Sequence, residues 1–120
     1  MSKSLGEFEQ AILFSLLQLD EDEAYGVRVR EAIEERTGRV ISSGAVYTAL
    51  DRMADRGLVT SFLGEPTSER GGRRKRLYSL EPAGLEALKR SVTHFQDMSR
   101  GLLPSLEARL SALKMGGEAP

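Results

Sequence analysis

The sequence predicts a mainly α-helical fold with one two-stranded β-hairpin and a long C-terminal helix. Residues 43–56 have apolar side chains at helical spacing and end at Gly57, which suits a left-handed helix stop. Two strand-like runs follow, at 58–63 and 75–80, and the loop between them ends in Gly71-Gly72-Arg73-Arg74-Lys75-Arg76. A helix followed by a hairpin with a cationic tip is typical of a winged helix-turn-helix, which offers duplex DNA two points of contact.

The composition is that of an ordinary globular domain. The 120 residues are 40% hydrophobic and 29% charged, enough for one domain with a modest core. The chain has no cysteine, which excludes disulfides and thiolate metal sites. It has neither an apolar run of about 18 residues nor the pattern of a secretory signal, so we expect a cytoplasmic protein without a membrane segment.

The charge is distributed unevenly along the chain. The net charge is −1, but residues 1–38 sum to −5 and residues 39–76 sum to +4. Phosphate attraction decays within roughly 10 Å at 0.1 M salt, so the local charge matters more than the total. The positive charge therefore coincides with the predicted helix and hairpin.

The N-terminal half predicts two helices before this unit. Residues 5–19 have an apolar stripe, and the centre of the segment is apolar nearly all round, which predicts cover on more than one side. We expect a second subunit to provide part of that cover. A second helix is predicted over 24–36, with Val29 and Ile33 pointing inward and Gly38 after its end.

The helix at 43–56 is the candidate for the DNA groove. Ser42 or Ser43 can cap its N-terminus, and Val46, Leu50 and Met53 point to the core. The opposite face has small side chains and hydrogen-bond donors that suit close approach to DNA. Its candidate DNA-binding residues are Ser42, Ser43, Gly44, Tyr47, Thr48 and Arg52. For Tyr47 the alternative is packing under the hairpin without touching DNA.

The hairpin tip is the second candidate contact. Five of the seven residues at 70–76 are basic, and we expect Arg73, Arg74 and Lys75 to bind phosphates. The alternative is a solvated hairpin end whose charge prevents edge-to-edge pairing between sheets.

The sequence divides into a winged-helix domain at 1–81, a dimerisation helix at 82–114 and a disordered tail at 115–120. Apolar residues of the last helix alternate by three and four, as in a coiled-coil seam. Gly101 and Pro104 interrupt it, which predicts a kink or a break into 82–100 and 104–114. About 30 helical residues would extend ~45 Å, too long for one small core, so we expect a homodimer. The predicted dimerisation residues are Phe8, Leu13, Leu17, Leu88, Val92, Phe95, Leu102 and Leu106.

No residues suggest catalysis. The only histidine, His94, lies within the last predicted helix, and no phosphate-binding loop or metal-ligand spacing is present. We therefore expect no enzyme activity, no metal and no cofactor.

The motifs together resemble the PadR family of transcriptional regulators over about residues 5–88. The resemblance rests on Tyr25-Gly26, on Ser43-Gly44-Ala45-Val46-Tyr47 with Leu50 and Arg52, on Gly57-Leu58-Val59, and on residues 72–80 followed by Gly84. It implies a winged-helix domain, a C-terminal dimerisation helix and repression at a palindromic operator. The short C-terminal part is similar to the family's small subgroup.

The predicted function is a homodimeric, double-stranded-DNA-binding transcriptional regulator, most simply a repressor. One alternative is a winged-helix module that binds another protein through its apolar seam. Another is a small-molecule sensor with a ligand site at the dimer interface, although the sequence specifies no particular effector.

Overall fold

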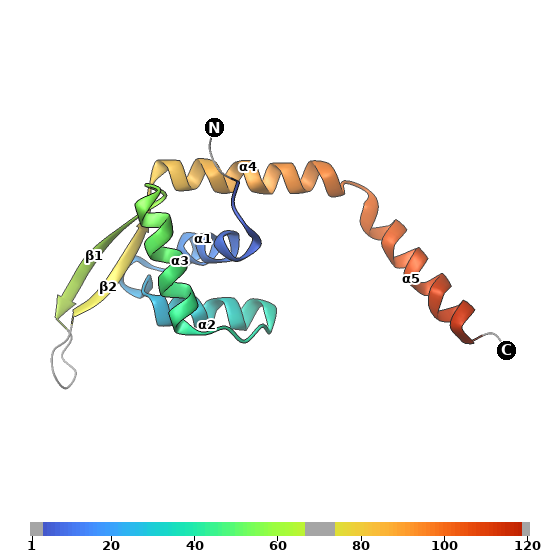
Figure 1. Cartoon of the computed structure of the whole chain (residues 1–120), viewed down its shortest axis with the longest axis horizontal. Helices are drawn as coiled ribbons and strands as arrows, with labels where there is room; N and C mark the ends of the chain where they lie inside the picture. The colour runs from blue at the N-terminus through green and yellow to red at the C-terminus, as the bar shows by residue number, and fades with distance from the viewer. Residues whose placement is uncertain (1–3, 67–73, 119–120) are drawn as a thin grey trace.

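The computed structural model describes residues 4–66 and 74–118 (Figure 1). Within these residues the fold is mainly helical with one antiparallel hairpin, as the sequence predicts. The elements are α1 (Glu7–Gln18), the 3-10 turn η1 (Glu21–Glu23), α2 (Gly26–Thr37), α3 (Ser43–Asp55), β1 (Val59–Pro66), β2 (Arg74–Leu80), α4 (Pro82–Ser99) and α5 (Leu102–Glu118). The hairpin and α5 extend from opposite ends of the helical body.

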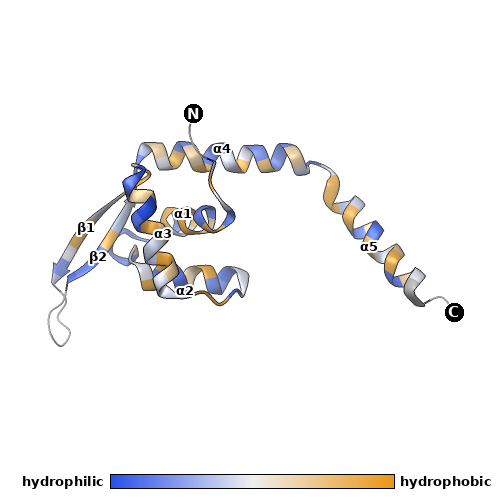
Figure 2. Cartoon of the chain, viewed as in Figure 1, coloured by the Kyte–Doolittle hydropathy of each residue, from blue (hydrophilic) through white to orange (hydrophobic). Residues whose placement is uncertain are grey.

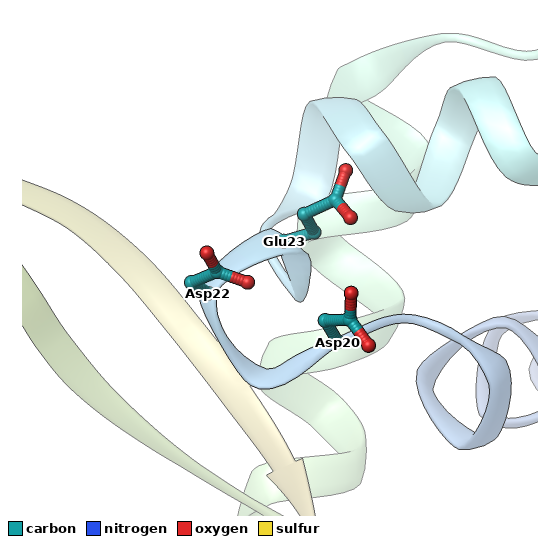
Figure 3. A group of neighbouring side chains, drawn as sticks. All are labelled: Asp20, Asp22 and Glu23. Carbon is teal, nitrogen blue, oxygen red and sulfur yellow. The ribbon is translucent and has the colours of Figure 1, made fainter.

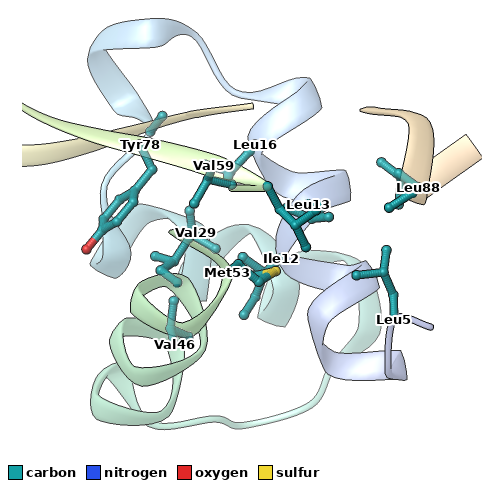
Figure 4. Close-up of a cluster of buried hydrophobic side chains, with 14 of the residues drawn as sticks. Leu5, Ile12, Leu13, Leu16, Val29, Val46, Met53, Val59, Tyr78 and Leu88 are labelled. Atoms are coloured by element: carbon teal, nitrogen blue, oxygen red, sulfur yellow. The ribbon is translucent and has the colours of Figure 1, made fainter. Parts of the chain in front are cut away.

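The core lies where the three N-terminal helices meet the base of the hairpin (Figure 4). Its largest fully buried side chains are Ile12, Leu13, Val29, Val46, Leu50 and Met53. Each such burial contributes roughly 1.5–3 kcal/mol relative to an exposed side chain. The inward positions predicted for α2 and α3 are therefore confirmed.

α1 is covered within its own subunit, which corrects the expected role of Leu13. The helix contacts α2, α3, α4 and β2, so its apolar centre has neighbours on several sides. Leu13 is fully buried among them, and Leu88 of α4 is 4% exposed in the same core. Neither side chain is free to contact a second subunit, because both are occupied by intramolecular packing.

Ser42 fixes the start of α3. Its side chain accepts a hydrogen bond of 3.1 Å from the backbone N–H of Ala45, so Ser42, not Ser43, is the cap. At the other end Gly57 has a φ of 75°, the left-handed conformation expected at this stop.

The hairpin is joined to the segment that precedes α2. β1 and β2 pair in an antiparallel register that includes Val59 with Leu80 and Leu63 with Arg76, and the register shifts between Leu63 and Pro66. The backbone N–H of Tyr78 donates to the carbonyl of Ala24 at 2.8 Å, and an isolated bridge pairs Tyr25 with Leu77. These bonds attach the free edge of β2 to the helical body.

The long C-terminal helix is broken rather than kinked. α4 ends at Ser99, and Gly101 has a φ of 74° that reverses the backbone locally. Pro104 then lies in the first turn of α5, where its missing N–H would have no helical partner anyway. The sequence therefore located the interruption correctly.

α5 projects from the body, and its residues 102–116 are all exposed (Figure 2). Five leucines of the helix are at least 50% exposed: Leu102, Leu103, Leu106, Leu110 and Leu113. The helix continues to Glu118, beyond the expected end at 114.

Candidate nucleic-acid interface

The N-terminal end of α3 is open to solvent and sterically slim. Ser42, Gly44 and Thr48 are exposed and Ser43 is half-buried. A Cβ atom added at Gly44 would meet nothing within 4 Å, so a large ligand can approach the backbone there. Arg52, one turn after Thr48, is exposed as well. The exposed side of α3 can present backbone amides and serine hydroxyls from its first turn, the Thr48 hydroxyl, and the Arg52 guanidinium from its last turn to an anionic polymer.

Tyr47 lies differently from its predicted neighbours. Its ring is half-buried and packs against Gly26, the first residue of α2. The pairing explains why a residue without a side chain occupies position 26. The packing of the Tyr47 ring on Gly26 therefore joins α3 to the start of α2.

The basic hairpin follows α3 in the chain, and its outer end projects away from the helical body (Figure 1). Arg74 and Lys75, two of the three predicted contacts, are exposed at the start of β2. The third, Arg73, lies outside the described residues. The Lys75 ammonium is 4.2 Å from the centroid of the Tyr25 ring, so a cation–π contact orients its side chain at the surface.

A polar cluster that sequence reasoning missed joins α3 to β2. The Tyr78 hydroxyl donates to a carboxylate oxygen of Asp51 at 3.2 Å, and Nη1 of Arg76 is 4.0 Å from the same oxygen. Burial and the adjacent Asp51 carboxylate raise the pKa of Tyr78, while Arg76 acts in the opposite direction. Asp51 and Tyr78 are 27 residues apart, so no local spacing could have indicated the contact.

The predicted dimerisation residues are divided between core and surface. Leu13 and Leu88 are buried in the subunit, as described above. Phe8 and Val92 are half-buried. The four that remain exposed are Leu17 at 56%, Phe95 at 70%, Leu102 at 50% and Leu106 at 56%.

An acidic cluster lies on the turn before α2. The carboxylates of Asp20, Asp22 and Glu23 lie within 4.8 Å of one another (Figure 3). Asp20 and Asp22 are exposed, and Glu23 forms an ion pair of 3.4 Å with Arg28. These contacts fit a solvated acidic connection between α1 and α2, and we assign no metal to it.

Within the described residues no helix is both long and apolar enough to pass through a lipid bilayer.

A helical core, an exposed α3 and a basic hairpin on one side define a winged-helix protein. The family model described as "Transcriptional regulator PadR-like family" matches residues 15–90. The chain therefore belongs to the PadR-like family of transcriptional regulators, and the resemblance found in its sequence motifs is confirmed.

Solved structures agree with this fold. A PadR family transcription regulator from a hypervirulent Clostridium difficile is 23% identical with a TM-score of 0.68, over 84% of this chain and 99% of that one. A PadR-like regulator from Bacillus cereus is 23% identical with a TM-score of 0.64, over 82% and 89%. A PadR family regulator from Eggerthella lenta is 21% identical with a TM-score of 0.62, over 84% and 87%. No curated protein matches the sequence.

Proposed function

We propose that the protein is a cytoplasmic, homodimeric repressor that binds a palindromic operator in double-stranded DNA. In each subunit the N-terminal end of α3 enters the major groove, and the hairpin contacts the adjacent phosphates. The observation that supports this most directly is the exposure of Arg74 and Lys75 at the start of β2, the strand whose Tyr78 hydroxyl donates to Asp51 of α3. Membership in a family of transcriptional regulators agrees with it.

The chemistry of α3 favours backbone and shape recognition over extensive base reading. The side chains at its exposed start, Ser42 to Ala45, are small, and the helix N-terminus attracts phosphate through its unpaired amides. Thr48 and Arg52 add one hydroxyl and one guanidinium on the open face. No asparagine or glutamine lies on this helix, so the bidentate contact to adenine is missing.

The hairpin supplies the part of the affinity that depends on salt but not on sequence. Arg73, Arg74 and Lys75 can each neutralise one phosphate and release a condensed counterion. Lys75 already stacks on Tyr25 in the free protein. Its side chain therefore loses less conformational entropy when it binds a phosphate.

The C-terminal helices support a homodimer. A single helix of this length is only marginally stable in water without tertiary packing. α5 nevertheless exposes Leu102 and Leu106, and Phe95 is exposed on α4. A second copy of the chain supplies equal apolar faces, and a twofold pair of subunits matches a palindromic site.

Selection of bound sequences from a random duplex library tests this function. We expect enrichment of one palindrome whose half-site centres are separated by about one helical turn, roughly 34 Å. Sedimentation of the protein with the enriched duplex should give two subunits per duplex. Recovery of a library with no enriched sequence, or one subunit on an asymmetric site, would contradict the proposal.

A further inference from the structure

Asp51 is an acidic side chain on the proposed DNA-binding side of α3. It lies on α3 between Thr48 and Arg52 and is 61% exposed at its side chain, on the same face as the exposed DNA-binding candidates. A carboxylate in this place repels the phosphates of an approaching duplex. Its presence therefore calls for a compensating role in the structure.

Among the described residues, the side-chain hydrogen bond and the ion pair of Asp51 are both formed with β2. One carboxylate oxygen accepts the Tyr78 hydroxyl and faces the Arg76 guanidinium at 4.0 Å. Residues 76 and 78 are two apart on a strand, so their side chains emerge on the same face of the hairpin. That face is turned toward α3, and Asp51 is the acceptor that both side chains share.

Tyr78 and Arg76 differ in exposure, which separates their roles. Tyr78 is 2% exposed and belongs to the hydrophobic core, so its hydroxyl is held in place and fixes the position of the Asp51 carboxylate. The Arg76 side chain is 57% exposed, and its guanidinium has donors left for a ligand. An exposed ion pair such as Asp51 with Arg76 contributes little to the stability of the fold. We therefore assign it the role of orienting the Arg76 side chain.

We infer that Asp51 is a positioning residue that holds Arg76 at the junction of α3 and the hairpin, where Arg76 contacts a phosphate. The inference rests on the proposed function and adds Arg76 to the predicted contacts. With Asp51 in place, the guanidinium stays beside α3, so its phosphate contact forms only when the helix is seated in the groove. Asp51 thereby lowers the affinity for DNA of any sequence and raises the ratio of operator affinity to mixed-sequence affinity.

A double-mutant cycle tests the coupling. The variants are Asp51→Asn, Arg76→Ala and the pair, and the probes are the enriched duplex and a mixed-sequence duplex of equal length. Asp51→Asn keeps an acceptor for the Tyr78 hydroxyl and removes only the charge that faces Arg76. Asp55→Asn is the matched control, because Asp55 lies one turn further along α3, is exposed and has no ion pair among the described residues.

We expect Asp51→Asn to strengthen binding to mixed-sequence DNA. The ratio of operator affinity to mixed-sequence affinity should fall by about threefold or more, which is a usual coupling between groups in contact. Arg76→Ala should lower the salt slope by about one unit for each subunit. In the Arg76→Ala background, Asp51→Asn should change the ratio no more than Asp55→Asn does.

Two failures are distinguishable in this experiment. If the unaltered protein binds neither duplex, the proposed function fails and the inference fails with it. If the unaltered protein binds the operator but the two substitutions act additively on the affinity ratio, only the role of Asp51 is overturned. Circular dichroism of each variant verifies that all four proteins are folded alike.

Discussion

The ring of Tyr47 lies directly on the backbone of Gly26. A Cβ atom at residue 26 would stand 2.5 Å from Cε1 of that ring, closer than real carbon atoms approach. The contact joins the start of α2 to the helix proposed to enter the groove. Two motifs separated by twenty residues in the sequence therefore form one packing unit.

Gly26→Ala should displace Tyr47 and destabilise the domain. Forcing a methyl group into this contact costs about 1–3 kcal/mol, as for other overpacked positions. Thermal unfolding followed by circular dichroism measures the loss. Gly44→Ala is the matched control, because it also lies early in a helix but meets nothing within 4 Å. The control should unfold at the same temperature or slightly higher, and equal losses in both variants would contradict the packing of Tyr47 on Gly26.

Stability should depend on Tyr78 at alkaline pH. Burial and Asp51 raise the pKa of its phenol, so folding favours the neutral form. This contribution is complete below the unfolded pKa of about 10 and is lost as the pH rises through the folded value. Tyr78→Phe removes the titrating group together with its hydrogen bond to Asp51.

Unfolding temperatures measured from pH 8 upward distinguish the two proteins. The unaltered protein should be the more stable at neutral pH, by about 1 kcal/mol for the lost hydrogen bond. Its unfolding temperature should then fall more steeply above about pH 10 than that of Tyr78→Phe. Parallel curves would show that folding does not raise the pKa of Tyr78.

The exposed leucines of α5 should determine subunit association. Leu102→Glu with Leu106→Glu removes two apolar side chains that are at least half exposed in their own subunit. Losing their burial costs about 3 kcal/mol or more, which raises the dimer dissociation constant about a hundredfold. Sedimentation equilibrium measures this constant. Ser105→Glu, on the same exposed turn, adds charge without removing a leucine and should leave the dimer intact; an unchanged constant in the double variant would place the interface elsewhere.

Periodicity and stop signals predicted the architecture well. The inward faces of α2 and α3, a serine cap at residue 42 or 43 and the break near Gly101 all follow from local sequence, because caps and stops act through neighbouring backbone groups. The cover of α1 did not follow. An apolar residue such as Leu13 gives the same signal whether it meets its own core or a partner, and here Leu13 is buried in the subunit's own core.

Side-chain pairs between elements far apart in the chain could not be predicted from the sequence either. The ion pair of 3.0 Å between Glu9 and Arg56 spans 47 residues and joins α1 to the end of α3. Asp51 could be assigned to the outer face of its helix, but its contacts with β2 depend on the angle between helix and hairpin. That angle is a tertiary property.

The salt dependence of duplex affinity tests the central claim most directly. The unaltered protein and the variant with Arg73→Ala, Arg74→Ala and Lys75→Ala should be titrated with one operator duplex at several salt concentrations. If the basic hairpin binds phosphates beside α3, the variant's slope of log affinity against log salt should be flatter by up to about three units for each subunit. An unchanged slope would show that the hairpin makes no contact with DNA.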